Sequence, residues 1–229
     1  MKFSKGAVDI ITSLLVVTIA LGLAVTAYTW GLPLIQKRQD TAVVERISSY
    51  FDQNSANSLP SKIEFIANNG GEQTFTIDAT GGWLLYTCTQ NELASCNPDP
   101  TVDITKENNS LQFTFFAKAS NIAVQSGFIS LTPGASCPPS AGVFGKDKSS
   151  VVCAKANATH DGFEITYRIW FREVIEPSGT RGYKIDLNKH ESSVYQSTGK
   201  TVRISRQAIN QVTVGSKTLI IPEIKILLE

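Results

Sequence analysis

The chain has 229 residues, of which 18% are charged, and its 21 basic and 20 acidic residues give a net charge of +1. This length allows one domain with an additional segment, or two small domains. A charge balance so close to neutral excludes the basic footprint of nucleic-acid-binding proteins, so no nucleic acid is expected as a partner.

An unbroken apolar stretch dominates the N-terminal segment, where Asp9 is the only charged residue between Ala7 and Ile35. These roughly 29 residues would form a helix about 44 Å long at about 1.5 Å per residue. A bilayer core needs only about 20 residues. The stretch is also about twice as long as the apolar part of a secretory signal peptide, which disfavours cleavage at its far end. A plain membrane anchor fits the composition, with Lys2 and Lys5 on the cytoplasmic side.

The start of this segment resembles the class III, prepilin-type signal of archaeal type IV pilins and archaellins. The resemblance covers about the first 40 residues and is carried by Lys5-Gly6 directly before Ala7, at the head of the apolar helix. In that family a membrane peptidase cuts after the glycine on the cytoplasmic side. The resemblance therefore implies a leader of residues 1–6 that is cleaved between Gly6 and Ala7. It also implies that the apolar helix stays in the mature protein and packs into a filament core.

Asp9 departs from the related bacterial pattern. Bacterial pilins carry a glutamate at the fifth mature position, whereas Asp9 would be the third residue after the cut. A carboxylate there could pair with a freed α-amino group in a core of low dielectric constant, where unpaired charge is costly. The alternative is an interfacial residue at the edge of the membrane.

The helix is expected to continue beyond the apolar stretch. Pro33 removes one backbone hydrogen bond and predicts a bend or a short melted stretch. After it, helical spacing places an apolar stripe on one face, formed by Ile35, Val43, Val44, Ile47 and Tyr50 or Phe51. Turn-forming residues then end the helix before a boundary near Leu59-Pro60. Residues 7–59 are thus predicted as one helical segment, hydrophobic and then amphipathic.

Apolar and polar side chains alternate with a period of two over residues 60–229, which predicts about eight to eleven strands without a helix between them. The fold class is therefore α+β: a long N-terminal hydrophobic helix followed by an all-β head of the β-sandwich or immunoglobulin-like type. A turn is expected at Glu107–Asn109, and Lys62–Ala67 is expected as a strand. The apolar end, Thr218–Glu229, predicts a buried central strand with Pro222 at a bulge or edge.

Four cysteines in a chain with a membrane segment indicate an oxidising compartment. The sequence allows three pairings, of which the nearest-neighbour one is favoured, joining Cys88 to Cys96 and Cys137 to Cys153. A zinc site is disfavoured because the spacings do not fit. Asn108 and Asn157 begin N-x-[ST] sequons and are possible N-glycosylation sites.

No catalytic or cofactor-binding constellation stands out, since the sequence has no G-x-S-x-G, no H-E-x-x-H and no phosphate-binding glycine loop. The chain is therefore expected not to be an enzyme and to bind no cofactor or metal. The favoured hypothesis is a structural subunit of an extracellular type IV pilus-like or archaellum-like filament. Its partners would be copies of itself, the cytoplasmic membrane before assembly, the prepilin peptidase and the assembly machinery. The alternative is a membrane-anchored cell-surface module that does not polymerise, used for binding or for anchoring a filament machine to the envelope.

Overall fold

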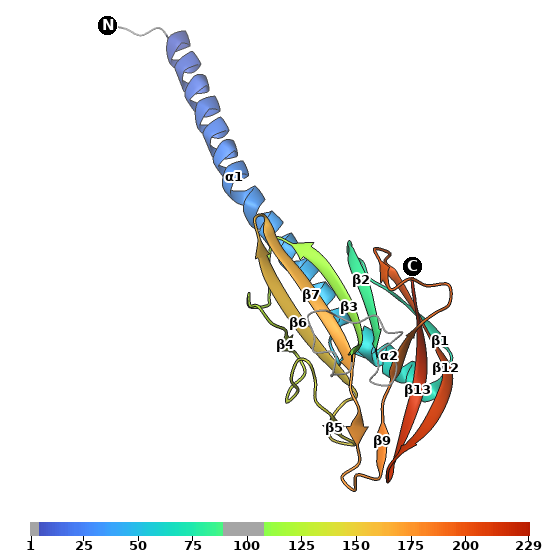
Figure 1. Ribbon diagram of the computed structural model, residues 1–229. Coiled ribbons are helices and arrows are strands. Elements are labelled where there is room, and N and C mark those ends of the chain that lie inside the picture. The colour runs from blue at the N-terminus through green and yellow to red at the C-terminus, as the bar shows by residue number, and fades with distance from the viewer. Residues whose placement is uncertain (1–4, 89–107) are drawn as a thin grey trace. The chain divides into compact units, whose positions relative to one another are not determined.

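The computed structural model describes residues 5–88 and 108–229. They divide into two compact units, residues 1–42 and residues 43–229. Helix α1 (Lys5–Tyr50) runs through the first unit and ends inside the second, which holds the second helix and the strands (Figure 1). A long N-terminal helix followed by a β-rich region with two sheets confirms the α+β class.

Helix α1 continues without interruption through Pro33. The short melted stretch that the proline predicts is therefore absent. Proline removes a single i to i−4 hydrogen bond, and in a helix of 46 residues the turns on both sides remain fully bonded.

The segment predicted as the first strand is instead helix α2 (Leu59–Asn69). Ser58 is its N-cap, and the Ser58 hydroxyl accepts a hydrogen bond from the Ser61 N–H at 3.4 Å. Pro60 lies in the first turn, where its missing N–H costs nothing. Gly70, with φ of 79°, ends the helix in a conformation that favours glycine. These start and stop signals outweigh the strand-like alternation between them.

The first sheet has seven strands in the order β1-β12-β13-β9-β8-β5, and β10 also pairs with β13. Three of its pairings, β10/β13, β13/β9 and β5/β8, are parallel. The strands are β1 Glu72–Thr76, β5 Gly142–Val143, β8 Val174–Ile175, β9 Arg181–Tyr183, β10 Asp186–Lys189, β12 Thr201–Val214 and β13 Lys217–Leu228.

The second sheet has six strands in the order β11-β2-β3-β7-β6-β4, all antiparallel. Its strands are β2 Gly81–Cys88, β3 Asn108–Ala117, β4 Ile129–Ser130, β6 Ser150–Thr159, β7 Gly162–Phe171 and β11 Gln196–Ser197. Because Asn108 and Asn109 pair with Cys88 and Thr87 in this ladder, the turn predicted at Glu107–Asn109 is wrong for these two residues.

One continuous hydrophobic core joins both sheets, α2 and the end of α1. It receives Val44 and Ile47 from α1 and Phe51 from the turn directly after it, each about 1% exposed. The Phe51 ring stacks on Tyr167 with ring centroids 4.7 Å apart. These residues confirm the amphipathic stripe predicted for the second part of the helix, except that Ile35 is exposed.

Strand β13 confirms the predicted central position, but only alternate residues from Pro222 to Leu228 are buried in it, whereas Ile220 is exposed. It pairs with β12 along one side, and with β9 and then β10 along the other. Pro222 lies between the residues that pair with β9, which end at Ile220, and those that pair with β10, which begin at Glu223. The missing N–H of Pro222 therefore falls where β13 has no strand opposite on that side.

Both faces of strand β7 are buried. Ile165, Tyr167, Ile169 and Phe171 lie in the main core, as their alternation predicts. On the opposite face, however, Arg168, Trp170 and Arg172 are also buried. A second small cluster covers this face, in which Trp170, Val151 and Cys153 contact Phe128, Ala135 and Cys137. The segment between β3 and β6 thus closes the outer side of the second sheet.

Candidate functional site

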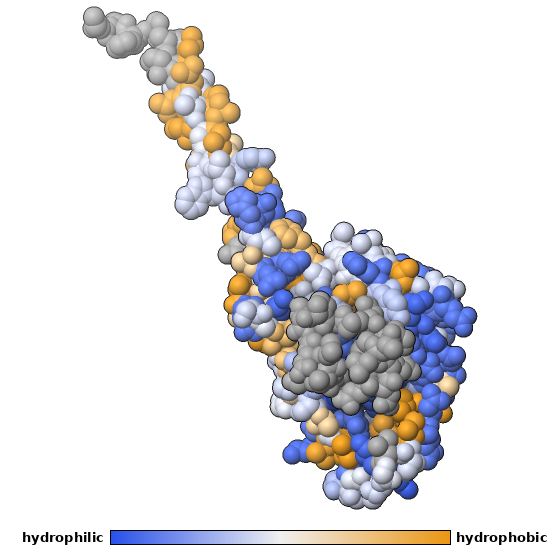
Figure 2. Space-filling model, viewed as in Figure 1, coloured by the Kyte–Doolittle hydropathy of each residue, from blue (hydrophilic) through white to orange (hydrophobic). Residues whose placement is uncertain are grey.

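The surface of α1 from Ile10 to Ile35 exposes large apolar side chains all around the helix, and the face seen in Figure 2 shows orange and pale residues along this stretch. Its exposed large apolar side chains are Ile10, Leu14, Leu15, Val16, Val17, Ile19, Leu21, Leu23, Val25, Tyr28, Trp30, Leu32, Leu34 and Ile35. By length and composition this helix could cross a membrane, and none of its most apolar part is buried. A helix that is hydrophobic all round requires apolar surroundings, which are lipid or other helices.

The threonines of this stretch satisfy their hydroxyl groups within the helix. The hydroxyls of Thr18 and Thr26 each donate to the carbonyl four residues earlier at 2.8 Å, and that of Thr29 does so at 3.0 Å. An unsatisfied hydroxyl is costly in an apolar medium, and bonding to the i−4 carbonyl removes that cost without a second chain. The helix therefore presents almost no unsatisfied polar group to apolar surroundings.

No contact within the described chain explains why the two positions of the stretch at 22 and 31 are glycines. A Cβ atom at Gly22 or at Gly31 would meet nothing within 4 Å, although glycine inside a helix costs about 1 kcal/mol relative to alanine. Gly31 continues a line of small residues at helical spacing, Ala20, Ala24 and Ala27. Small side chains on one face allow another helix to approach closely.

The predicted leader-cleavage residues, Gly6 and Ala7, lie in the first turns of α1. The side chain of Asp9 falls outside the described residues. Its pairing with an α-amino group therefore stays a prediction.

The disulfide between Cys137 and Cys153 is present, with the two Cα atoms 6.2 Å apart. It ties the segment that covers the outer face of the second sheet to strand β6. The other predicted disulfide lies outside the described residues, since Cys96 and the side chain of Cys88 are not described.

The two sequons lie in different surroundings. The side chain of Asn108 is 3% exposed in strand β3. A glycan needs the amide nitrogen at the surface, so this site is not available in the folded head. Asn157 is half-buried near the open end of β6, where its amide lies 3.4 Å from Glu164, and its sequon threonine, Thr159, is exposed. Glycosylation at Asn157 stays a prediction.

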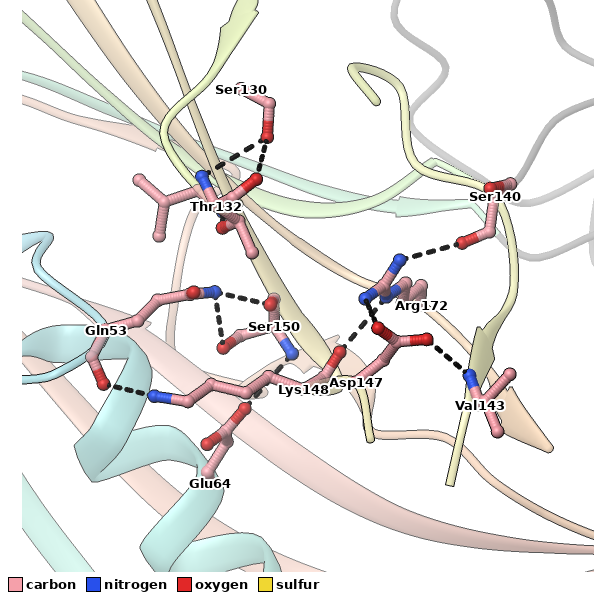
Figure 3. Close-up of polar contacts among 11 residues, drawn as sticks. Gln53, Glu64, Ser130, Thr132, Ser140, Val143, Asp147, Lys148, Ser150 and Arg172 are labelled. Carbon is pink, nitrogen blue, oxygen red and sulfur yellow. Dashed lines mark hydrogen bonds and ion pairs between the residues drawn. The ribbon is translucent and has the colours of Figure 1, made fainter. Parts of the chain in front are cut away.

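A polar cluster that the sequence does not signal connects the residues after α1 to the segment near the disulfide (Figure 3). Lys148 Nζ donates to the Gln53 carbonyl at 2.7 Å, and Gln53 Nε2 donates to the Ser150 carbonyl. The Ser150 N–H donates in turn to Glu64 of α2 at 3.1 Å. The Arg172 Nε donates to the Lys148 carbonyl at 3.0 Å.

A cavity of about 320 Å³ beside this cluster is lined by Asp52, Gln53, Lys146, Asp147, Lys148 and Arg172 among others. Three of these charged groups are already engaged within the protein: Lys148 binds a carbonyl, and Arg172 lies 3.8 Å from Asp147. The cluster therefore joins three segments of the head, which is a structural role. No group of three or more His, Cys, Asp or Glu residues that could hold a metal occurs among the residues described.

Arg168 is a second feature that sequence reasoning missed. The guanidinium carbon lies 4.4 Å from the centre of the Tyr86 ring, 4.9 Å from that of Phe128 and 4.8 Å from that of Trp170. Its Nε donates to Gln112 Oε1 at 2.9 Å. Such cation–π contacts are favourable when the cation is shielded from water, so Arg168 binds the covering segment to the sheet.

Comparison with known proteins gives no relative: no family model matches the chain, and no curated protein or solved structure matches it.

Proposed function

We propose that the chain is a structural subunit of an extracellular type IV pilus-like or archaellum-like filament. The observation that carries the proposal is the surface of α1 between Ile10 and Ile35, which is exposed and apolar on all sides. In this role the helix lies in the cytoplasmic membrane before assembly and among the helices of other copies afterwards.

The physical basis is that lipid and neighbouring helices are equivalent solvents for such a surface. The hydrophobic effect does not favour one over the other, so close van der Waals packing drives the exchange. The small residues Ala20, Ala24, Ala27 and Gly31 support close packing. The hydroxyls of Thr18, Thr26 and Thr29 are bonded within the helix and need no new partner in the exchange. Trp30, which is 81% exposed, suits the outer boundary of the membrane before assembly.

The head would be the part that faces solvent in the filament. Two sheets that share one core support the finer proposal of an immunoglobulin-like β-sandwich. The disulfide between Cys137 and Cys153 supports a location outside the cytoplasm, where disulfides persist.

The test is the mass and the N-terminal sequence of the mature protein in the producing cell, combined with electron microscopy of the cell surface. A chain that starts at Ala7 and is found in filaments supports the proposal. A chain that keeps Met1 and forms no filaments supports a membrane anchor that does not polymerise. A chain that starts after about Ala27 would be a secreted head, and the proposal would be wrong.

The processing step has its own variant and control. We expect Gly6→Val to block cleavage and to leave unprocessed protein in the membrane, because a prepilin peptidase requires the small residue before the cut. Gly22→Val makes the same chemical change deeper in the helix, where a side chain meets open space, and should be cleaved normally. Normal cleavage and assembly of the Gly6→Val protein would contradict the proposal.

A further inference from the structure

We propose that the open edge of strand β12 is a pairing surface at which a second copy of this chain adds its own β12 in antiparallel orientation. Strand β1 pairs with β12 only between Thr201 and Ser205. The next residue, Arg206, donates its N–H to the Gly71 carbonyl. From Ala208 to Thr213, β12 pairs with β13 on one side, and within the described chain no strand pairs with its other side.

The direction of the backbone groups along this edge follows from the contacts of β13. Thr218 N–H donates to the Thr180 carbonyl, and Lys184 N–H donates to the Ile220 carbonyl. The backbone groups of Thr218 and Ile220 therefore point away from β12. In an antiparallel ladder, directly opposed residues either bond to each other or both point away.

The residues opposite Thr218 and Ile220 are Thr213 and Gln211, so their N–H and C=O groups point to the open edge. Ile209 agrees with this pattern, because its partner is Pro222, which has no N–H to donate to it. Ile209, Gln211 and Thr213 thus present three donors and three acceptors in a row. This is the arrangement that an added strand requires.

The sequence does not protect this edge as edge strands are usually protected. Natural edges are kept short or carry charged residues, proline or bulges. Strands β4, β5 and β11, which end the two sheet orders, have two residues each, and β1 begins with the exposed Glu72. The open stretch of β12 contains no charge and no proline over residues 207–213, and its single bulge lies at its start, between Arg206 and Ala208.

A second copy fits this edge because of its symmetry. When a strand pairs antiparallel with itself about a two-fold axis, residues near the axis face themselves or close neighbours, so any charge would face a like charge. Pairing centred on Asn210 uses residues 207–213 of both copies and brings no charged residues together. Ile209 and Val212, which are 55% and 40% exposed and point to opposite faces, add apolar contact on both sides of the joined sheet.

This contact concerns the head alone and does not rest on the filament proposal. A two-fold contact uses each edge once and closes as a dimer. It therefore joins the heads of two copies, whether these are anchored in a membrane or belong to separate filaments.

The test introduces a positive or a negative charge at Gln211 of the full chain in detergent micelles. The association constant is measured by sedimentation. We expect Gln211→Lys and Gln211→Glu each to weaken self-association about fivefold or more, because like charges then meet near the two-fold axis. An equimolar mixture of the two variants should associate at least as tightly as the unmodified chain. Helix α1 is unchanged in all samples, so association through α1 contributes equally.

Gln196→Lys and Gln196→Glu are the matched controls, because Gln196 is exposed on the two-residue edge strand β11. These variants should associate like the unmodified chain. The proposal is overturned if the unmodified chain shows no association that the Gln211 variants weaken, or if mixing the Lys and Glu variants does not restore it. Unchanged thermal unfolding of the head confirms that each variant is folded.

Discussion

Replacing Phe51 with alanine tests whether the residue that directly follows α1 is part of the core of the head. The ring is 1% exposed. It stacks on Tyr167 at 4.7 Å, and the Trp83 and Phe113 rings both lie 6.4 Å away. Truncating a buried phenylalanine to alanine costs about 3–5 kcal/mol, from lost burial and from the cavity that remains. A typical domain has a free energy of unfolding of about 5–15 kcal/mol, so Phe51→Ala should remove about a fifth of it or more.

The assay is chemical unfolding of the full chain in detergent, followed by tryptophan fluorescence, to which the fully buried Trp83 contributes. The midpoint denaturant concentration should fall strongly for Phe51→Ala. Phe65→Ala is the control, since Phe65 is 53% exposed on α2 and its loss should change the free energy of unfolding by about 0.5 kcal/mol or less. Equal effects of the two substitutions would refute the assignment of Phe51 to the core of the head.

Two further predictions concern single polar groups in the head. Asn109 is fully buried and joins the two sheets: its amide donates to the Phe171 and Ile185 carbonyls, and its Oδ1 accepts from the Leu187 N–H at 2.9 Å. Asn109→Leu should therefore lower the free energy of unfolding by about 2–4 kcal/mol in the same assay, whereas an equally large loss with the half-buried Asn157→Leu would contradict this reasoning. Burial and the nearby Glu64 carboxylate raise the pKa of Tyr183 to about 12. In the unfolded chain the Tyr183 hydroxyl has a pKa near 10, so the unfolded chain releases a proton that the folded head retains. The free energy of unfolding should therefore fall as the pH rises from about 10 to about 12. Tyr183→Phe should make this fall shallower, and identical pH profiles of the two proteins would contradict the raised pKa of Tyr183.

The sequence predicted the parts of the fold that depend on local pattern. The apolar length of α1, the inward face of β7 and the central position of β13 follow from residue periodicity alone. Helix α2 shows the limit of that method: in Lys62–Ala67 the alternation of Ile63 and Phe65 matches a strand, but the structure buries Ile63 and Ile66 and exposes Phe65. The N-cap at Ser58 and the proline in the first turn mark the start of α2. From the sequence alone, these residues are instead predicted as the end of the preceding helix.

Long-range contacts explain the remaining differences. Arg168 and Trp170 occupy the polar face of β7 by alternation, and nothing near them in sequence announces the segment from Phe128 to Cys137 that covers them. Asn109 belongs to a stretch that is typical of a turn, yet its amide groups find their partners 62 to 78 residues away along the chain. A polar residue that is buried by distant partners carries no local sign of burial.

The two parts of α1 need different surroundings, and a polar stretch of the chain separates them. Residues 36–42 (QKRQDTA) carry no large apolar side chain, and the compact unit of the head begins directly after them, at Val43. Every side chain of the main core lies at or beyond this point, so the head does not use the apolar stretch before Ile35 to complete its fold. Exchanging lipid for neighbouring helices around that stretch therefore leaves the core contacts of the head unchanged. In the proposed filament, such a subunit could fold its head before assembly and join the filament without refolding it.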